Sequence, residues 1–252
     1  MTDTKVLTIA VVLCQGVTIL DYQGPMEILE TASVNSLAGP WLQSIPGFPN
    51  PKVKFECEFV AESLEPIRGT SGPMVVASKT FDEVLSKQFD IIMIPAGAGA
   101  PWTRQMWLRD AGNLDHATAT PTSFDSENIP KPVAKFLLAQ VPGAQYIFSV
   151  CAGSWILAAL GLLDGRQATT NKSSFDEIKK STSPAVQWIA KARWVIDGKF
   201  WTSSGVTAGQ DMAYEFLKTV AGQEFATAAK NAVELRAASA DDDEFADVFH
   251  LV

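Results

Sequence analysis

The sequence predicts an α/β fold built on a central, mostly parallel β-sheet. Three short apolar runs, rich in β-branched residues, have the composition of strands buried on both faces, and each ends abruptly in small or polar residues. Stretches with helical periodicity alternate with these runs, as in sheets whose parallel strands are joined by helices. With 252 residues, of which 47% are hydrophobic and 19% charged, the chain is expected to fold as a single domain, residues 1–252.

The expected strands share a high apolar content and lie at residues 6–13 (VLTIAVVL), 90–94 (DIIMI) and 145–150 (QYIFSV), with a further strand-like run at 55–60 (FECEFV). The expected helices have an apolar stripe and lie at residues 22–32, in part of 102–116, and at 131–140 and 154–162. Ligands of parallel sheets bind beyond the carboxyl ends of the strands. The residues that follow Leu13, Ile94 and Val150 are therefore where a site is predicted.

Two later features are predicted from turn and capping residues. Residues 193–196 and 199–202 flank Asp197-Gly198, a dipeptide suited to a type I′ hairpin turn. Thr207 follows, and we expect it to cap a helix that runs to Leu217.

Two stretches, residues 35–51 and 112–132, are rich in proline or in polar residues and are expected to be surface insertions that wall a cleft.

Composition and charge argue against several kinds of binding partner and site. The net charge of −8 repels phosphate backbones, so nucleic acid is disfavoured, and the acidic run 241–244 is expected to be a solvated face. The first apolar run is too short for a membrane span, and no signal peptide is recognised. Three widely spaced cysteines predict a reducing, cytoplasmic setting, and two histidines disfavour a histidine metal centre.

Cys151 is the candidate nucleophile, because it lies where a strand is expected to pass into a helix. Free amide groups and the helix dipole at such a junction are expected to lower the pKa of a thiol. The string Ser149-Val150-Cys151-Ala152-Gly153 is similar to a nucleophile elbow, although a serine stands where the first glycine is usual. Cys14 and Cys57 are interpreted as packing residues.

A nucleophilic thiol needs a partner that moves protons. Asp21 follows the first strand and is the favoured partner, with helix capping as the alternative role. A Cys-His dyad stays open only if His116 or His250 folds back to the site. The small-residue loop 95–99 (PAGAG) is expected to offer the amide of Gly97, together with that of Ala152, as an oxyanion hole.

These pieces resemble the DJ-1/PfpI superfamily, whose members have class I glutamine-amidotransferase-like, flavodoxin-type sandwiches. The resemblance runs from residue 6 to about residue 217 and is carried by six strings: LDYQGP (20–25), IPAG (94–97), SVCAGS (149–154), LGLLDG (160–165), ATT (168–170) and SGVTAGQD (204–211). The first and last of these look most like the isonitrile (isocyanide) hydratase branch. The resemblance implies a three-layer sandwich, a catalytic Cys151 opposed by Asp21, no bound cofactor, and a homodimer.

The chain departs from the family pattern in ways that bear on the substrate. Asn171 stands where a histidine commonly follows Ala-Thr-Thr, and Ala152 stands where hydratase-like members usually carry threonine. We assign Trp102, Thr170 and Asn171 to the substrate pocket.

The predicted function is addition of water to an isocyanide through a thioimidate on Cys151. The alternatives are a glyoxalase-like or deglycase-like activity on small dicarbonyls, and a cysteine redox sensor without enzymatic activity. A transcriptional regulator is not expected, since regulators of this superfamily carry an added helix-turn-helix domain.

Overall fold

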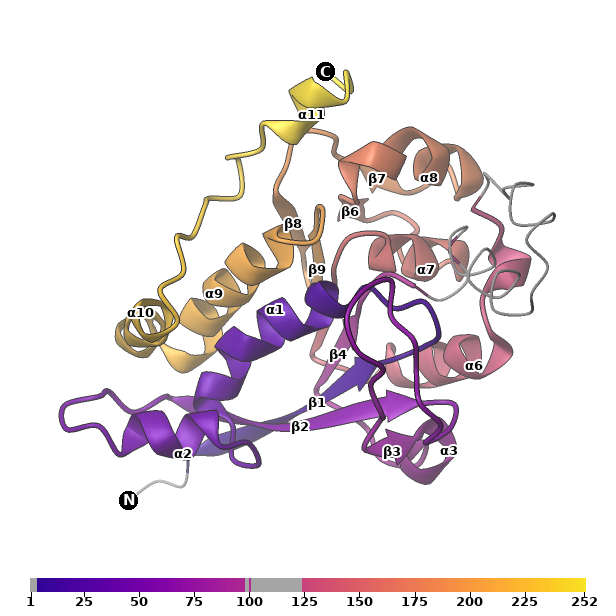
Figure 1. Cartoon of the computed structure of the whole chain (residues 1–252). Coiled ribbons are helices and arrows are strands. Elements are labelled where there is room, and N and C mark those ends of the chain that lie inside the picture. Colours follow the sequence, from indigo (N-terminus) through magenta and orange to yellow (C-terminus); the bar gives the residue numbers. More distant parts are fainter. Residues whose placement is uncertain (1–3, 98–99, 101–123) are drawn as a thin grey trace.

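A seven-stranded sheet lies at the centre of the computed structural model, which describes residues 4–97, 100 and 124–252 (Figure 1). Its strand order is β3-β2-β1-β4-β5-β9-β8, and every neighbouring pair is parallel except β8–β9. The strands are β1 (Lys5–Val12), β2 (Val53–Ala61), β3 (Lys79–Thr80), β4 (Ile91–Ile94), β5 (Tyr146–Ser149), β8 (Trp194–Asp197) and β9 (Phe200–Ser203). Two further strands, β6 (Gln167–Ala168) and β7 (Gln187–Trp188), form a small separate pair.

Helices cover both faces of the sheet, which gives the three layers that the resemblance implied (Figure 1). On one face lie α1 (Ile19–Leu29), α9 (Ala208–Ala221) and α10 (Gln223–Ala232), and on the other lie α6 (Lys131–Gln140) and α7 (Gly153–Ala159). The shorter helices are α2 (Ala38–Gln43), α3 (Phe81–Val84), α8 (Phe175–Ser181) and α11 (Phe245–Val248), with 3₁₀ turns η1 (Glu30–Ala32), η2 (Ser126–Asn128) and η3 (Lys172–Ser174).

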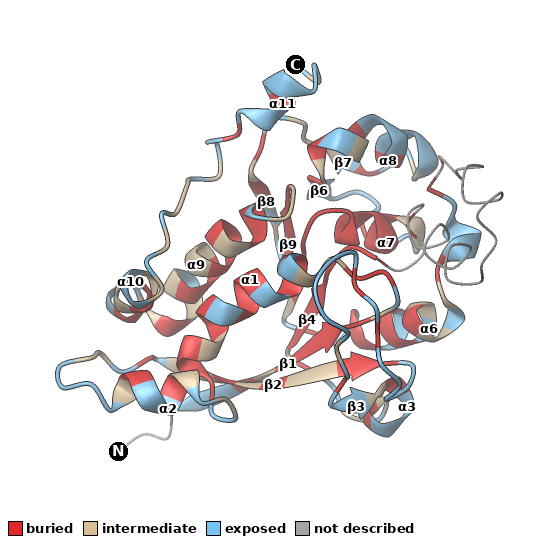
Figure 2. Cartoon of the chain, viewed as in Figure 1, coloured by how far each residue is buried: buried red, intermediate tan, exposed pale blue. Residues whose placement is uncertain are grey.

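The core is packed between the sheet and these helices, where Figure 2 shows the buried residues concentrated. Phe216 of α9 has ring contacts with Tyr146 and Phe148 of β5 and with Trp201 of β9. Because side chains alternate along a strand, Ser149 points to the opposite face. The strand that carries the elbow is thereby packed against α9 on one face.

The predicted strands 6–13, 55–60, 90–94 and 145–150 are confirmed as β1, β2, β4 and β5, and the helix at 131–140 is confirmed as α6. The expected helix at 22–32 is α1 continued by η1, and the one at 154–162 is the shorter α7. Register pairs Val11 with Met93 and Ile94 with Ser149. The carboxyl ends of β1, β4 and β5 therefore lie side by side, as the site prediction required.

The hairpin prediction was wrong in register and in turn type. Asp197 pairs with Phe200, so the two loop residues are Gly198 and Lys199. Of these only Gly198 has a positive φ, +59°, whereas a type I′ turn needs positive φ at both central residues. Positive φ at the first position alone fits a type II′ turn.

Two other local predictions were also wrong. Thr207 occupies the N-cap position of α9 without a capping hydrogen bond, and its hydroxyl instead accepts one from Arg193. The acidic run 241–244 is not uniformly solvated, because Asp243 is buried in an ion pair with Lys172. Both side chains are engaged by partners distant in sequence.

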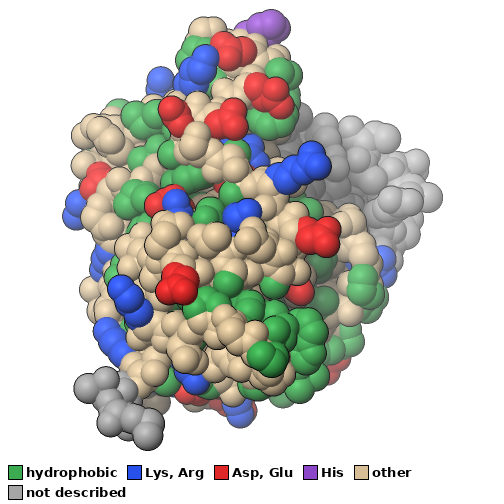
Figure 3. Space-filling view, turned by 90° about the vertical axis from the view of Figure 1, so that its left-hand side faces the viewer, with side chains coloured by type: hydrophobic (Ala, Val, Ile, Leu, Met, Phe, Trp, Pro, Cys, Tyr) green, Lys and Arg blue, Asp and Glu red, His purple; other side chains and the backbone are tan. Residues whose placement is uncertain are grey.

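The segment 35–51 forms α2 and lies near the amino ends of β1 and β2, away from the edge where the loops after β1, β4 and β5 meet (Figure 1). The expectation that it walls a cleft there was wrong. Figure 3 shows apolar side chains gathered on the lower part of one face, and the segment around α2 carries Leu37, 91% exposed, and Trp41, 64% exposed. Of the second predicted insertion, 112–132, residues 112–123 lie outside the described residues.

None of the helices in the described part of the chain has the length and hydropathy that crossing a bilayer requires.

Candidate active site

Cys151 sits on a sharp turn between β5 and α7, with a φ of +58°. A positive φ is unusual for a residue with a side chain, and such strained positions gather at functional sites. The turn is held by two backbone hydrogen bonds, from the amide of Cys151 to the carbonyl of Ser204 (2.9 Å) and from the amide of Gly153 to that of Val150 (2.9 Å). A Cβ on Gly153 would lie 2.1 Å from the Ile94 carbonyl oxygen, so only glycine fits there. This geometry is that of the predicted elbow.

The carbonyl group of Cys151 is fixed as well as its amide. The hydroxyls of Thr170 and Ser154 donate to this carbonyl oxygen at 3.1 and 3.2 Å. Thr170, predicted to line the substrate pocket, thus acts on the backbone of the elbow. These bonds stabilise a backbone conformation that the cysteine would not adopt by preference.

Asp21 lies in the first turn of α1 and is fully buried. It is not the helix cap, since Thr18 holds that position. One carboxyl oxygen, Oδ2, accepts a hydrogen bond of 3.0 Å from the amide of Ala96, in the loop after β4. The other, Oδ1, has no hydrogen-bond donor of good geometry among the described residues, and the Cys151 thiol is the polar side chain that interacts with this carboxyl group. The structure therefore brings Asp21 and Cys151 together.

Burial sets the protonation of this pair. It raises the pKa of Asp21 from 3.8 to about 8, against the opposing effects of the Ala96 amide and the Cys151 thiol. Burial also raises the pKa of the Cys151 thiol, and the neighbouring Asp21 charge raises it further. The prediction of a thiol with a lowered pKa was wrong, because loss of solvent and a like charge outweigh the amide donors at the elbow.

Two donors nevertheless face the sulfur. The amide of Ala152 is a backbone donor to Cys151, and the side-chain Nδ2 of Asn171 donates to Sγ at 3.3 Å. Asn171 is itself oriented, since its Oδ1 accepts hydrogen bonds from the amide of Ser173 (2.9 Å) and from the Ser173 hydroxyl. The predicted pocket residue Asn171 is thus in direct contact with the sulfur.

Of the other predicted site residues, Gly97 and His250 lie in the described part of the chain, whereas Trp102 and His116 do not. Gly97 adjoins Ala96, and with φ +145° a Cβ there would come within 2.7 Å of the Val17 backbone. Trp102 and His116 lie outside the described residues. His250 is an exposed residue just after α11.

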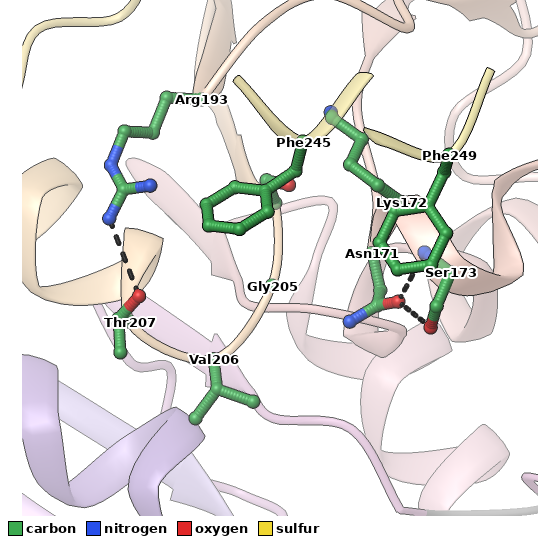
Figure 4. Close-up of a pocket in the computed structure, with 10 residues that line it drawn as sticks. Asn171, Lys172, Ser173, Arg193, Gly205, Val206, Thr207, Phe245 and Phe249 are labelled. Atoms are coloured by element: carbon green, nitrogen blue, oxygen red, sulfur yellow. Dashed lines mark hydrogen bonds between the residues drawn. The ribbon is translucent and has the colours of Figure 1, made fainter. Parts of the chain in front are cut away.

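A pocket of about 220 Å³ opens beside Asn171. Figure 4 shows Phe245 and Phe249, from the segment around α11, on one side, and Gly205 and Val206, from the loop between β9 and α9, on the other. Ser204, whose carbonyl accepts the Cys151 amide, also lines it. Two residues that line the pocket, Asn171 and Ser204, thus make hydrogen bonds with Cys151, which is not itself among the described residues that line it.

Sequence reasoning missed the charged groups around this pocket. The Lys172 amine pairs with Asp243 at 3.3 Å and donates to the Thr169 hydroxyl (2.7 Å) and the Ala192 carbonyl (2.8 Å). Burial lowers the pKa of Lys172 to about 8, although Asp243 opposes this. Arg193 makes a second ion pair, with Asp211 at 2.6 Å, in which the two side chains are 13% and 3% exposed. The one indication in the sequence that a charged residue lies at this pocket was that Lys172 directly follows Asn171.

Three comparisons place these features among known proteins. The sequence model of the DJ-1/PfpI family matches residues 124–219. The chain is 29% identical to an isonitrile hydratase of Pseudomonas putida over 188 residues, which cover 74% of this chain and 66% of that protein. It is 30% identical to deglycase PH1704 of Pyrococcus horikoshii over 142 residues, 56% of this chain and 68% of the relative.

A weaker match covers 50% of this chain and 37% of the transcriptional regulator GbdR of Pseudomonas aeruginosa, at 28% identity. The chain thus spans just under two thirds of the hydratase and little over a third of the regulator. Among solved structures, DJ-1beta of Drosophila melanogaster has a TM-score of 0.64 at 17% identity, with 92% of this chain and 99% of that chain covered.

Proposed function

The chain belongs to the DJ-1/PfpI family, and from this premise we propose that it is a cysteine-dependent hydratase that adds water to an isocyanide and releases an N-substituted formamide. The observation that carries the proposal is a thiol on a strained elbow that interacts with a buried carboxyl group whose pKa is about 8. The match to an isonitrile hydratase supports the choice of substrate class.

In the first step the sulfur of Cys151 attacks the terminal carbon of R–N≡C. The C–S bond forms as that carbon takes up a proton, which gives the thioimidate R–N=CH–S. The thiol supplies this proton, and Asp21 carries it from sulfur to carbon. A carboxyl group with a pKa near 8 suits this task, since it holds a proton at neutral pH and releases it to a stronger base.

In the second step a water molecule adds to the thioimidate carbon. Asp21, protonated again after the first step, gives its proton to the imine nitrogen and takes one from the water. The C–S bond then breaks as the proton of the new hydroxyl group passes to sulfur through Asp21, which restores the thiol and releases R–NH–CHO. One water is consumed for each isocyanide, and the residues return to their starting state.

We assign each hydrogen-bond donor around Cys151 to a negative charge that develops during the reaction. Asn171 and the Ala152 amide face the sulfur, and we propose that they stabilise its negative charge during attack and departure. We assign to the amide of Gly97 its predicted role of binding the oxygen of the added water. The pair Cys151 and Asp21 then supplies the covalent and proton-transfer chemistry.

The test is formamide formation from cyclohexyl isocyanide, followed by NMR, in the parent protein and in the Cys151→Ser and Asp21→Asn variants. Proton transfer by a positioned group contributes about 10²–10⁴ in rate. We expect at least a 100-fold loss in the Asp21 variant and a larger loss in the Cys151 variant. An Asp21→Asn protein within tenfold of the parent would remove Asp21 from the mechanism.

A second candidate is a deglycase-like or glyoxalase-like activity, which the 30% identity to deglycase PH1704 favours. Thiols add readily to aldehydes, but rearrangement of the resulting hemithioacetal to lactate needs a base. Asn171, which contacts the sulfur, cannot serve as that base. Lactate formation from methylglyoxal, assayed beside formamide formation, distinguishes the two reactions.

We further propose a small-molecule substrate, a homodimer and a cytoplasmic location. The net charge of −8 argues against a nucleic-acid partner. The exposed Leu37 and Trp41 near α2 support self-association, and the free thiols of Cys57 and Cys151 support a reducing compartment. Light scattering after gel filtration tests the dimer, and Trp41→Asp should shift it toward monomer.

A further inference from the structure

We infer that the C-terminal segment, residues 236–252, builds the wall of the substrate pocket that selects the group attached to the reacting carbon, and that the buried Lys172–Asp243 pair holds this wall in place. The preferred group is a ring-sized apolar substituent. The inference rests on the proposed function for its substrate, but not for its test. It concerns a segment that lies outside the stretch matched by the family model, residues 124–219.

The pocket lies where a substituent of the substrate would extend. Asn171 lines it and also donates to the Cys151 sulfur at 3.3 Å, and Ser204 lines it while accepting the Cys151 amide. Cys151 is not itself among the described residues that line the pocket, and the inference places the remaining atoms of a molecule that reacts at the sulfur in this space, beside Asn171. Its volume of about 220 Å³ exceeds the roughly 150 Å³ cavity that binds a benzene molecule in an engineered protein.

The C-terminal segment gives the pocket its apolar character. Phe245 and Phe249 face the space, and they remain 40% and 45% exposed although they are aromatic (Figure 4). Val206 contributes apolar surface from the opposite wall. Because an apolar ring gains most where it displaces water from such surfaces, the pocket favours rings over small polar groups.

The segment is attached to the body of the domain at successive points. The amide of Ala238 donates to Asp211 at 3.1 Å, and the amide of Arg193 donates to the carbonyl of Ala240 at 2.7 Å. Asp211 in turn pairs with Arg193 at 2.6 Å. These contacts guide the chain to Asp243, two residues before Phe245.

The Lys172–Asp243 pair is the attachment nearest to the pocket. The two side chains are only 2% and 0% exposed, whereas Lys191 and Asp247, which pair at 3.0 Å in the same region, are 52% and 59% exposed. Breaking a buried pair leaves a charge without a partner, while an exposed pair contributes little. Lys172 also directly follows Asn171, so the same pair connects the wall to the residue that contacts the sulfur. Asp243 is thus a positioning residue, and Asp247 is its matched control.

The experiment measures how fast Cys151 is alkylated by two probes, iodoacetamide and N-benzyl iodoacetamide, with intact mass and peptide mapping as readout. Hydration of isocyanides is not required. Each probe's rate with Cys151 is divided by its rate with free glutathione. In the parent protein this corrected rate is expected to be at least fivefold higher for the benzyl probe than for iodoacetamide. The Phe249→Ala and Asp243→Asn variants are expected to lower the benzyl-to-small rate ratio at least fivefold, and Asp247→Asn by less than twofold.

The inference is overturned if the parent shows no benzyl preference, or if Phe249→Ala keeps the parent ratio. Equal effects of Asp243→Asn and Asp247→Asn would overturn the role of the buried pair. Circular dichroism confirms that each variant is folded, and Phe249→Ala tests the wall even where Asp243→Asn fails to fold. A protein that shows the benzyl preference but forms no formamide would refute the hydratase proposal and leave this inference standing.

Discussion

Replacing Asp21 with asparagine should make the folded protein more stable at neutral and mildly alkaline pH. The folded state holds the Asp21 proton up to a pH of about 8, whereas the unfolded chain releases it near the ordinary pKa of 3.8. Asparagine has nearly the same shape, can still accept the Ala96 amide through its oxygen, and carries no charge to bury. The cost of ionising this buried site therefore disappears.

The direction in which the free energy of unfolding changes with pH follows from proton binding. Between pH 3.8 and about 8 the folded state binds more protons at Asp21 than the unfolded state does, so the free energy of unfolding falls as pH rises across this window. Each pH unit corresponds to about 1.4 kcal/mol, which sets a ceiling of about 6 kcal/mol once pH 8 is reached. Relaxation of the site and entry of water lower this penalty, and we expect a gain of about 3 kcal/mol at pH 8.

The assay is urea unfolding followed by tryptophan fluorescence at pH 5, 6, 7 and 8, since the chain has seven tryptophans. The difference in unfolding free energy between Asp21→Asn and the parent should grow with pH. Asp82→Asn, whose carboxyl-bearing side chain is 88% exposed, is the control and should show no such trend. A constant difference between Asp21→Asn and the parent across this range would refute the raised pKa of Asp21.

Three further outcomes are expected. The rate of Cys151 alkylation by iodoacetamide should rise through pH 8, because burial raises the pKa values of both members of the pair, and a rate already at its plateau at pH 6.5 would contradict this. Asn171→Ala should lower kcat/KM for formamide formation about 10- to 100-fold, since a hydrogen bond to a charged group contributes about 1.5–3 kcal/mol; an unchanged value would remove Asn171 from the mechanism. Gly153→Ala should lower the free energy of unfolding by at least about 3 kcal/mol in thermal denaturation, because its Cβ would overlap the Ile94 carbonyl, and a protein of parental stability would mean that the elbow is less tightly packed.

The sheet could be predicted because its signals are local. The runs that became β1, β4 and β5 are apolar on both faces, and the rule that sites lie at the carboxyl ends of parallel strands identified the loops that carry Cys151, Asp21 and Ala96. The turn at Cys151 was also predictable, since the small residues that follow it leave room for a tight backbone.

What could not be predicted depends on contacts between distant residues. The protonation of Cys151 is set by the depth of burial and by Asp21, 130 positions earlier, rather than by the amides at the elbow. In the sequence Asp243 is one of four consecutive acidic residues, 241–244, and nothing distinguishes it from the others. Only the fold shows that Lys172 is buried against it. Thr207 has a capping residue's position, yet its hydroxyl contacts Arg193.

The most direct test of the central claim is to stop the reaction of the protein with excess cyclohexyl isocyanide within milliseconds and map the adduct by mass spectrometry. Nucleophilic attack by Cys151 predicts the full mass of the isocyanide added to the peptide that contains Cys151, and its disappearance as formamide accumulates. Formamide produced at the parental rate by a Cys151→Ala protein, with no adduct on Cys151 in the parent, would contradict the account.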